Sequence, residues 1–318
     1  MKILANDGLD AAGIKMLEAA GFEIDAVKIP QEELAAKIAA YDVLVVRSAT
    51  KVNAGILKAS KLKLVARAGV GTDNIDGNCA RELGIPVVNT PDAGSRSVAE
   101  LVVAHLFSLA RMLPLCNRRM PEHGKQEFND LKKKASAGFE LQGKKLGILG
   151  FGRIGQELAR MAIGLGMEVL VYDHKKRDFQ LKISFHPSYK LPECAIEIRS
   201  KSLKEVLSEA DFVSVHTPGS SEALGEMEIS QMKAGTCLIN CARGGVVNES
   251  ALIDALDSGR IAFAGLDVFS KEPPLDDRLL RHPNVSLSPH IGASTREGQE
   301  RVGTELAERI IAHFKKQG

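Results

Sequence analysis

The sequence predicts an α/β protein made of two doubly wound parallel-sheet domains. Short apolar runs alternate with helix-length segments along most of the chain, which is typical of βαβ units and of parallel sheets. A glycine-rich turn at residues 150–155 starts a second series of this alternation near the middle of the chain. The 318 residues are enough for two domains of ordinary size.

The first 97 residues show one complete series of strands and helices. The helices after the first and fourth strands are expected to stop at Gly21 and Gly84, because glycine readily adopts the left-handed conformation that ends a helix. The expected strands are Ile3–Ala5, Glu23–Val27, Val43–Val46, Leu64–Ala66 and Pro86–Asn89, and the expected helices are Leu9–Ala20, Pro30–Ala40, Asn53–Ala59 and Ile75–Leu83.

The remainder of the chain carries the second series. A long apolar helix at Ser95–Met112, with Ser95 as its N-cap, is expected to lead into the second domain. The lysine-rich region Pro114–Gly143 is expected to be irregular, and residues 174–201 to form an extended, mixed connection. The other expected strands are Leu146–Leu149, Met167–Tyr172, Phe212–His216, Thr236–Cys241, Ile261–Asp267 and Val285–Ser288, and the other expected helices begin near Arg153 or span Ser202–Glu209, Asn248–Ser258 and Ser294–Lys315.

Composition excludes several classes of protein. A net charge of +2 favours neither nucleic acid nor an anionic membrane as a partner. The five cysteines are odd in number and form no CxxC pair, so we expect reduced thiols, with no disulfide framework and no metal site. No signal peptide is expected, because the chain turns polar after its first four residues, and no apolar run approaches the roughly 20 residues that span a bilayer. A cytoplasmic protein is expected.

The turn after Leu146–Leu149 has the G-x-G-x-x-G pattern of dinucleotide binding, formed by Gly150, Gly152 and Gly155. The first glycine permits a tight turn, the second lets a pyrophosphate approach the backbone, and the third lets the helix pack closely on the strand. The N–H groups at the start of the helix, around Arg153 and Ile154, would face the pyrophosphate.

Asp173 ends the next strand, about 20 residues downstream, where a carboxylate binds the ribose hydroxyls. It favours NAD over NADP because it would repel a 2′-phosphate. The basic residues His174, Lys175, Lys176 and Arg177 follow directly and could accept that phosphate, or could form only a solvated loop, so NADP remains an alternative.

Polar residues follow the later strands of the second series. Ligands bind beyond the carboxyl ends of strands in open α/β sheets, and these positions supply Arg243, Glu272 and His290. Hydride transfer from a hydroxy acid needs a base and a cation. A histidine titrates near pH 6.5 and suits the proton, a glutamate can support it, and an arginine can hold a carboxylate. Each residue also has an ordinary structural explanation. His290 could be a hydrogen-bonded structural histidine, Arg243 could hold a loop in place, and Glu272 could cap a turn.

Eight stretches together resemble the NAD-dependent D-2-hydroxyacid dehydrogenases, and among these most of all the phosphoglycerate dehydrogenases. They are RSATKV, RAGVGTDNID, NTPDAGSRSVAEL, LGILGFGRIG, VHTP, NCARGGVVNESAL, GLDVFSKEPP and SPHIGAST, and they cover nearly the whole chain. The resemblance implies a flavodoxin-like substrate domain formed by residues 1–97 and 289–318, a Rossmann NAD-binding domain at 98–288, and an active site in the cleft between them. The C-terminal regulatory domain of longer phosphoglycerate dehydrogenases is expected to be absent, since the sequence stops at Gly318.

The same resemblance assigns roles to individual residues. Arg243, Glu272 and His290 would be catalytic, and Asp267 would contact the nicotinamide carboxamide. Arg47 and Ser48 would face the substrate phosphate, and the backbone of Val70 and Gly71 would hold its carboxylate alongside Arg243. The other implied cofactor contacts are His216, Thr217, Pro218, Cys241, Ala242 and Gly292.

The implied reaction converts D-3-phosphoglycerate and NAD to 3-phosphohydroxypyruvate and NADH, in serine biosynthesis. The implied assembly is a homodimer, in which Lys133 reaches the neighbouring subunit's site from a dimerisation arm at 114–143. Two alternatives remain open. One is the same chemistry on glyoxylate, hydroxypyruvate or another small acid, and the other is an NAD-sensing scaffold of the corepressor type with negligible turnover.

Overall fold

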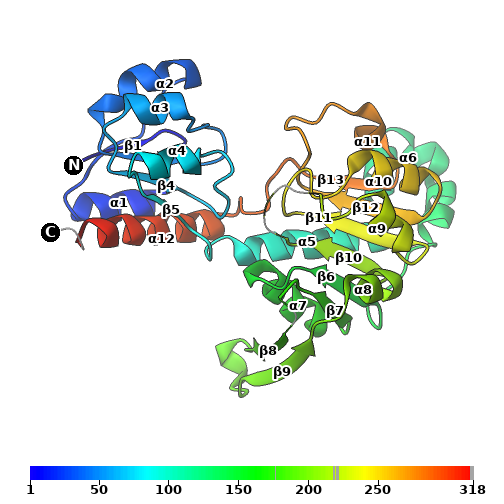
Figure 1. Ribbon diagram of the computed structural model, residues 1–318. Helices are drawn as coiled ribbons and strands as arrows, with labels where there is room; N and C mark the ends of the chain where they lie inside the picture. Colours follow the sequence, from blue (N-terminus) through cyan, green and yellow to red (C-terminus); the bar gives the residue numbers. More distant parts are fainter. Residues whose placement is uncertain (176, 218, 220–221, 316–318) are drawn as a thin grey trace. The chain divides into compact units, whose positions relative to one another are not determined.

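The computed structural model describes residues 1–175, 177–217, 219 and 222–315, and the chain forms two compact units (Figure 1). One unit comprises Met1–Ser97 with Ala293–Gly318, and the other comprises Val98–Gly292. The chain returns to the first unit at Ala293, not at residue 289, so the loop that carries His290 belongs to the second unit.

The first unit is a parallel sheet covered by helices on both faces. Its elements are β1 (Lys2–Ala5), α1 (Ala11–Ala19), β2 (Glu23–Asp25), α2 (Gln31–Lys37), η1 (Ile38–Ala40), β3 (Val43–Val46), α3 (Ala54–Ala59), β4 (Leu64–Arg67), α4 (Gly77–Glu82), β5 (Val87–Asn89) and α12 (Arg296–Lys315). The strand order β2-β1-β3-β4-β5 is that of flavodoxin-like folds. Successive strand residues point to opposite faces, where α1 and α12 pack on one side and α2, α3 and α4 on the other.

The last helix belongs to this unit because it crosses α1 at very short range. α12 lies alongside α1 (Figure 1), and a Cβ atom added to Gly13 would lie 2.5 Å from the carbonyl oxygen of Gly303. A Cβ atom on Gly303 would in turn lie 2.8 Å from Cβ of Asp10. Only glycines permit this approach of the two backbones.

The second unit is also a parallel sheet, with strand order β13-β12-β11-β10-β6-β7. Its elements are α5 (Ser95–Ala110, which enters from the first unit), α6 (Leu113–Ala135), β6 (Lys145–Leu149), α7 (Arg153–Gly164), β7 (Glu168–Tyr172), β8 (Asp178–Ile183), η2 (Pro187–Tyr189), β9 (Cys194–Arg199), α8 (Leu203–Glu209), β10 (Phe212–Val215), α9 (Glu226–Gln231), β11 (Thr236–Asn240), α10 (Glu249–Asp257), β12 (Ile261–Leu266), α11 (Asp277–Arg281) and β13 (Val285–Leu287). The chain proceeds from β6 outward to β7 and later resumes at β10 on the other side of β6. This reversal is the point at which doubly wound folds bind ligands.

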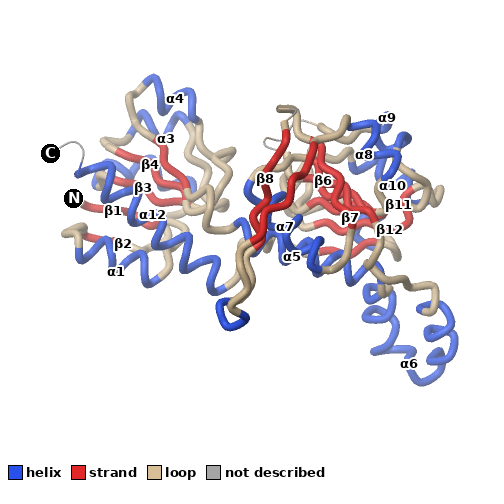
Figure 2. Tube along the Cα trace, turned by 90° about the horizontal axis from the view of Figure 1, so that it is seen from below, coloured by secondary structure: helices blue, strands red, loops and turns tan. Residues whose placement is uncertain are grey.

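The region Pro114–Gly143, expected to be irregular, is mostly the long helix α6, so that prediction was wrong. Its lysine, glutamate and glutamine residues favour helix even where few side chains are buried. Pro114 stands at the start of the helix, where its missing N–H costs nothing, and Leu131 is the buried residue of α6. Figure 2 shows α6 extending from the body of the second unit.

Ser95 was also assigned wrongly as an N-cap. It is the first residue of α5 itself, and its buried Oγ has no hydrogen-bond partner in the part of the chain that the structure describes. Among the described residues, no single helix combines the length and apolar character of a membrane span, although α5 and α6 meet these criteria as a pair bent by 63°.

Residues 174–201, expected to be an extended, mixed connection, contain an antiparallel hairpin of β8 and β9. Phe179, Leu181 and Ile198 are its buried side chains. The ring of Phe179 meets the ring of Phe151 edge-on, with centroids 4.7 Å apart. Phe151 lies within the glycine turn, so the hairpin packs beside the expected cofactor site, next to β7 (Figure 1).

Candidate functional site

The glycine turn follows β6 and has the shape that a dinucleotide requires. Gly150 has φ of +96°, and a Cβ atom there would lie 2.7 Å from the carbonyl oxygen of His216. A Cβ atom on Gly155 would lie 2.5 Å from the carbonyl oxygen of Gly150. At Gly152, by contrast, a Cβ atom would meet no atom of the described residues within 4 Å. The protein itself therefore requires the first and third glycines, and the second leaves open the space that a pyrophosphate would take.

The start of α7 adds a suitable electrostatic field. Gly152 is the N-cap and offers no capping side chain, so the positive end of the helix dipole favours an anion at the start of α7, next to Arg153 and Ile154. Asp173 directly follows β7 and lies beside this turn, where its Oδ2 accepts a hydrogen bond from the Phe151 amide at 3.0 Å. Burial raises the pKa of Asp173, but the amides of Phe151 and Lys175 outweigh this and hold it below its usual value. An ionised carboxylate thus stands where ribose hydroxyls would donate.

The end of β10 faces the same turn and carries unsatisfied polar atoms. His216 Nδ1 and Thr217 Oγ1 are buried, and neither has a hydrogen-bond partner among the described residues. Such orphaned groups are uncommon in a protein interior and fit a site completed by a bound molecule. His216 Nε2 is paired with Ser214 Oγ at 2.9 Å. Pro218, expected to line the adenosine side, lies outside the described residues.

His216 makes the stability of the protein depend on pH. Burial lowers the pKa of His216 to about 4, whereas a histidine in the unfolded chain titrates near 6.5. Below about pH 6.5 the histidine is protonated in the unfolded chain but stays neutral in the folded chain. The contribution of His216 to the free energy of unfolding is therefore full above that pH and is lost as the pH falls toward 4. We expect this group to lower the free energy of unfolding by about 2 kcal/mol between pH 7 and pH 5. Denaturant titrations of the wild type and of His216→Gln at both pH values test this, and equal losses in the two proteins would contradict it.

Arg243 lies in a turn after β11 that Asn240 organises. Asn240 Oδ1 accepts a hydrogen bond from the Ala242 amide at 3.1 Å, and Asn240 Nδ2 donates one to the Arg243 carbonyl at 2.9 Å. The Arg243 guanidinium donates to the Ala242 carbonyl at 2.7 Å. A Cβ atom on Gly244 would lie 1.8 Å from the carbonyl oxygen of Phe269, so this turn packs directly against the loop that leads to Glu272. Cys241 is buried, and burial raises the pKa of its thiol well above the usual value, which disfavours the thiolate form that a nucleophile needs.

His290 and Glu272 form a direct pair. His290 Nδ1 lies 2.8 Å from Glu272 Oε2, and the two side chains are 42% and 40% exposed. Glu272 Oε1 also accepts from the Phe269 amide at 3.3 Å, which orients the carboxylate. With Nδ1 held by Glu272, the Nε2 atom of His290 remains to exchange a proton. The pair borders a pocket of about 310 Å³ whose lining is mainly apolar.

Asp267, expected to contact the nicotinamide, supports the loop that holds His290. Its oxygens accept from the amides of Ile291 and Gly292, both at 2.8 Å, and its carbonyl accepts from the His290 amide at 2.8 Å. His290 has φ of +55°, a conformation that costs a non-glycine residue about 1–3 kcal/mol. The Asp267 hydrogen bonds offset that cost and keep the imidazole in place.

Two residues without a predicted role, His105 and Ser288, complete this support. Ser288 Oγ donates to Asp267 Oδ1 at 2.7 Å, and it lies 3.2 Å from Nε2 of the buried His105. Because the Ser288 hydroxyl donates its proton to the Asp267 carboxylate, it must accept the hydrogen bond from His105. The proton of that bond therefore lies on His105 Nε2. Burial lowers the pKa of His105, although the charge of Asp267 opposes this. His105 is thus neutral, with Nδ1 bonded to Ser286 Oγ at 2.9 Å.

The expected substrate residues lie in two places. Arg47 and Ser48 directly follow β3, and Val70 and Gly71 lie in the loop after β4, all within the first unit. These loops touch each other, because Asn74 donates from the second loop to the carbonyl of Arg47. Lys133 is exposed in the last turn of α6, within the second unit.

The chain is similar to a known protein family and to curated relatives. The model of the D-isomer specific 2-hydroxyacid dehydrogenase NAD-binding domain matches residues 103–292. Hydroxypyruvate reductase of Thermotoga maritima is 42% identical over 98% of this chain and 97% of its own length. D-3-phosphoglycerate dehydrogenase of Methanocaldococcus jannaschii is 41% identical over 98% of this chain, which spans 57% of that relative's length.

Solved structures show the same fold over nearly the whole chain. The TT0316 protein of Thermus thermophilus superposes with a TM-score of 0.81 at 31% identity, covering 99% of this chain and 97% of that one. An NAD-dependent formate dehydrogenase of Staphylococcus aureus, solved with NAD, has a TM-score of 0.80 at 28% identity and covers 100% of this chain and 97% of that one. The predicted fold class, family and NAD cofactor are confirmed. The chain therefore belongs to the D-isomer specific 2-hydroxyacid dehydrogenases and is an NAD-dependent oxidoreductase.

Proposed function

We propose that this enzyme interconverts D-3-phosphoglycerate and 3-phosphohydroxypyruvate, with His290 as the acid–base residue, and that it serves serine biosynthesis. The observation that carries the chemistry is the 2.8 Å pair of His290 and Glu272, in the same unit as the glycine turn. NAD, when bound, accepts a hydride from C2 of the hydroxy acid. All other steps fall to side chains and backbone groups of this chain.

His290 Nε2 removes the proton of the C2 hydroxyl as the C2–H bond breaks, so that C2 becomes a carbonyl and the proton resides on the imidazole. Glu272 stabilises the resulting cation through Nδ1. Arg243 binds the substrate carboxylate and orients C2. In the reverse direction His290 returns the proton to the carbonyl oxygen.

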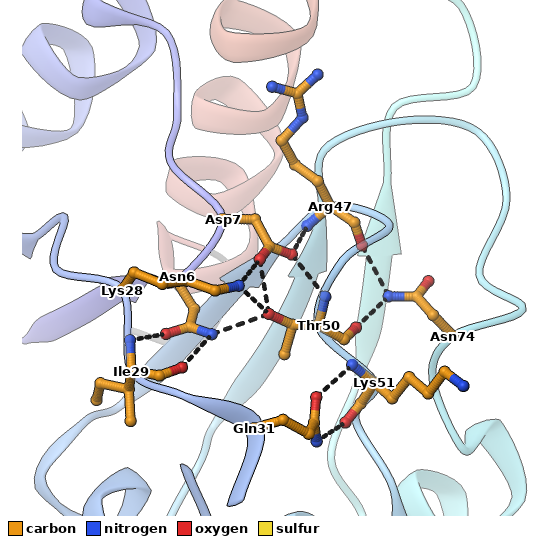
Figure 3. A network of polar contacts seen from close by, with 9 residues as sticks. All are labelled: Asn6, Asp7, Lys28, Ile29, Gln31, Arg47, Thr50, Lys51 and Asn74. Atoms are coloured by element: carbon orange, nitrogen blue, oxygen red, sulfur yellow. Dashed lines mark hydrogen bonds and ion pairs between the residues drawn. The ribbon is translucent and has the colours of Figure 1, made fainter. Parts of the chain in front are cut away.

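The proposal of a phosphorylated substrate rests on Arg47. This arginine is half-buried directly after β3, and its guanidinium points away from the polar network that holds its backbone (Figure 3). An arginine in that position offers two parallel donors to a phosphate.

Hydroxypyruvate reduction is a second candidate function, because a relative of that name matches this chain over 97% of its own length. The D-3-phosphoglycerate dehydrogenases, by contrast, are matched over about half of theirs, from 48% to 57%. The chemistry of His290 and Glu272 would be the same in both cases.

A substrate panel with Arg47→Glu separates the two candidates. We expect NADH oxidation by the wild type to be fastest with 3-phosphohydroxypyruvate. The charge reversal should lower kcat/KM for that acid by about 100-fold, the value of a lost charge-assisted hydrogen-bond pair, and change it for glyoxylate by less than about threefold. NADPH is tested in parallel, because His174, Lys175 and Arg177 lie near Asp173.

The other outcomes of the panel are equally informative. A preference for hydroxypyruvate or glyoxylate in the wild type would replace the substrate assignment and keep the mechanism. Binding of NADH without turnover on any acid would favour a scaffold of the corepressor type.

We further propose a homodimer that uses α6, which presents Leu113, Met120 and Phe128 to solvent. In this assembly Lys133 would contact the substrate of the partner subunit. All five cysteines are free, which supports a reducing cytoplasm as the location. Sedimentation of the wild type and of Phe128→Glu would test the dimer, and identical sedimentation coefficients would contradict it.

A further inference from the structure

The turn from Arg47 to Thr50 is held by side chains from two other parts of the first unit (Figure 3). Asp7 Oδ2 accepts from the amides of Arg47 and Thr50, at 2.7 and 3.0 Å. On the other side, Asn74 Nδ2 donates to the carbonyls of the same two residues, both at 2.7 Å. One carboxylate oxygen and one amide nitrogen therefore fix both ends of the turn, while Ser48 between them is exposed.

The side chain of Asp7 is buried, and each of its two oxygens accepts two hydrogen bonds. Its side chain is 4% exposed, and its second oxygen accepts from Thr50 Oγ1 at 2.7 Å and from Lys28 Nζ. Burial raises the pKa of Asp7, but the hydrogen bonds from Lys28, Thr50 and Arg47 outweigh it and leave the pKa below its usual value. A buried carboxylate with four donors is a rigid anchor, because each donor would lose its partner if the turn moved.

The parallel sheet explains why Asp7 reaches this turn. β1 pairs with β3 in the register Ala5↔Val45, so the residues that follow the two strands lie side by side. Asn6 reinforces the contact, with its Nδ2 donating to Thr50 Oγ1 at 2.8 Å. Asn74 lies in the loop that carries Val70 and Gly71, so the same set of bonds couples the two loops assigned to substrate.

We propose that Asp7 is a positioning residue that sets the substrate range of the enzyme by holding the Arg47–Thr50 turn, with Asn74 as its counterpart on the opposite side. This inference rests on the proposed function, since it requires that Arg47 contacts the distal group of the substrate. Loss of the anchor should penalise an acid that extends to Arg47 and spare an acid that is too short to reach it.

The experiment compares 3-phosphohydroxypyruvate with glyoxylate as substrates of Asp7→Ala. We expect KM for the phosphorylated acid to rise by about ten- to a hundredfold, the usual consequence of displacing a binding group by about 1 Å, while KM for glyoxylate and both kcat values stay within about threefold. Asp7→Asn should restore most of the affinity, because its remaining oxygen can accept from both amides. Lys28→Met is the control that removes the ion pair and leaves the turn bonded, and it should resemble the wild type.

Each other outcome has a definite meaning. Equal losses on both acids, with Arg47→Glu still selective for the phosphorylated one, would overturn the positioning role and leave the proposed function intact. Failure of Arg47→Glu to discriminate would instead overturn the assignment of Arg47. If Asp7→Ala does not fold, Asn74→Ala opens the turn from its solvent-accessible side, and the absence of selectivity in that variant would also overturn the inference.

Discussion

His290→Gln is expected to lower kcat for the reduction of a 2-oxo acid by about 10²–10⁴-fold, the usual contribution of a positioned acid–base group. The glutamine keeps roughly the size of the imidazole and can still bond to Glu272, but it cannot exchange a proton. The Kd for NADH should remain within about twofold of the wild-type value, because His290 lies after β13 and outside the glycine turn. Stopped-flow turnover and NADH fluorescence titration give the two quantities separately.

Matched variants make this result specific. Glu272→Gln should lose less activity than His290→Gln, because its side chain is 40% exposed and water can replace part of its hydrogen bonding. His186→Gln makes the same substitution at an exposed site beyond β8 and should behave as the wild type. Turnover of His290→Gln close to the wild-type rate would remove His290 from the mechanism.

The sheet and the glycine turn were predictable because their causes are local. A strand buried on both faces must be a short apolar run, and β3, with the sequence VLVV, has all four residues buried. Asn53, Ser202 and Asn248 cap the helices that follow them, which the sequence also indicates.

The errors arose where a local signal was weighed incorrectly. In α6, polarity was taken as a sign of a loop, although its lysine and glutamate residues are strong helix formers. In β8 and β9 the alternation of apolar and polar residues was present, as in DFQLKI, with buried Phe179 and Leu181 between exposed neighbours. The helices α9 and α11 have six and five residues, too few to show helical periodicity.

The supporting residues of the site could not be read from local pattern. His105 and Ser288 are 183 positions apart, and only the packing of α5 against the end of β13 brings them together. Asp7 carried one signal that was not used, since a polar pair, Asn6 and Asp7, directly follows a buried strand. The carboxyl end of that strand is where an α/β sheet places functional groups, so Asp7 could have been singled out, whereas its partners Thr50 and Asn74 could not.

Gly152→Ala is expected to raise the Kd for NADH by about tenfold or more while leaving the melting temperature within about 2 °C of the wild-type value. A methyl group at Gly152 meets no atom within 4 Å in the described part of the chain, so it should not strain the fold. It would instead occupy the space that the pyrophosphate needs at the start of α7. Fluorescence of bound NADH is a clean measure here, because the chain contains no tryptophan.

Two further glycines supply the comparison. In Gly155→Ala the new methyl group would lie 2.5 Å from the Gly150 carbonyl oxygen, so α7 must move away from β6 and both the melting temperature and the NADH affinity should fall. Gly164 lies in α7 with open space around it. Gly164→Ala should leave NADH binding unchanged and should stabilise the helix by about 1 kcal/mol. Loss of affinity without loss of stability at Gly152 alone is the pattern that a pyrophosphate at this turn requires. If Gly152→Ala binds NADH as tightly as the wild type, the cofactor does not approach the second glycine, and its placement on this turn is wrong.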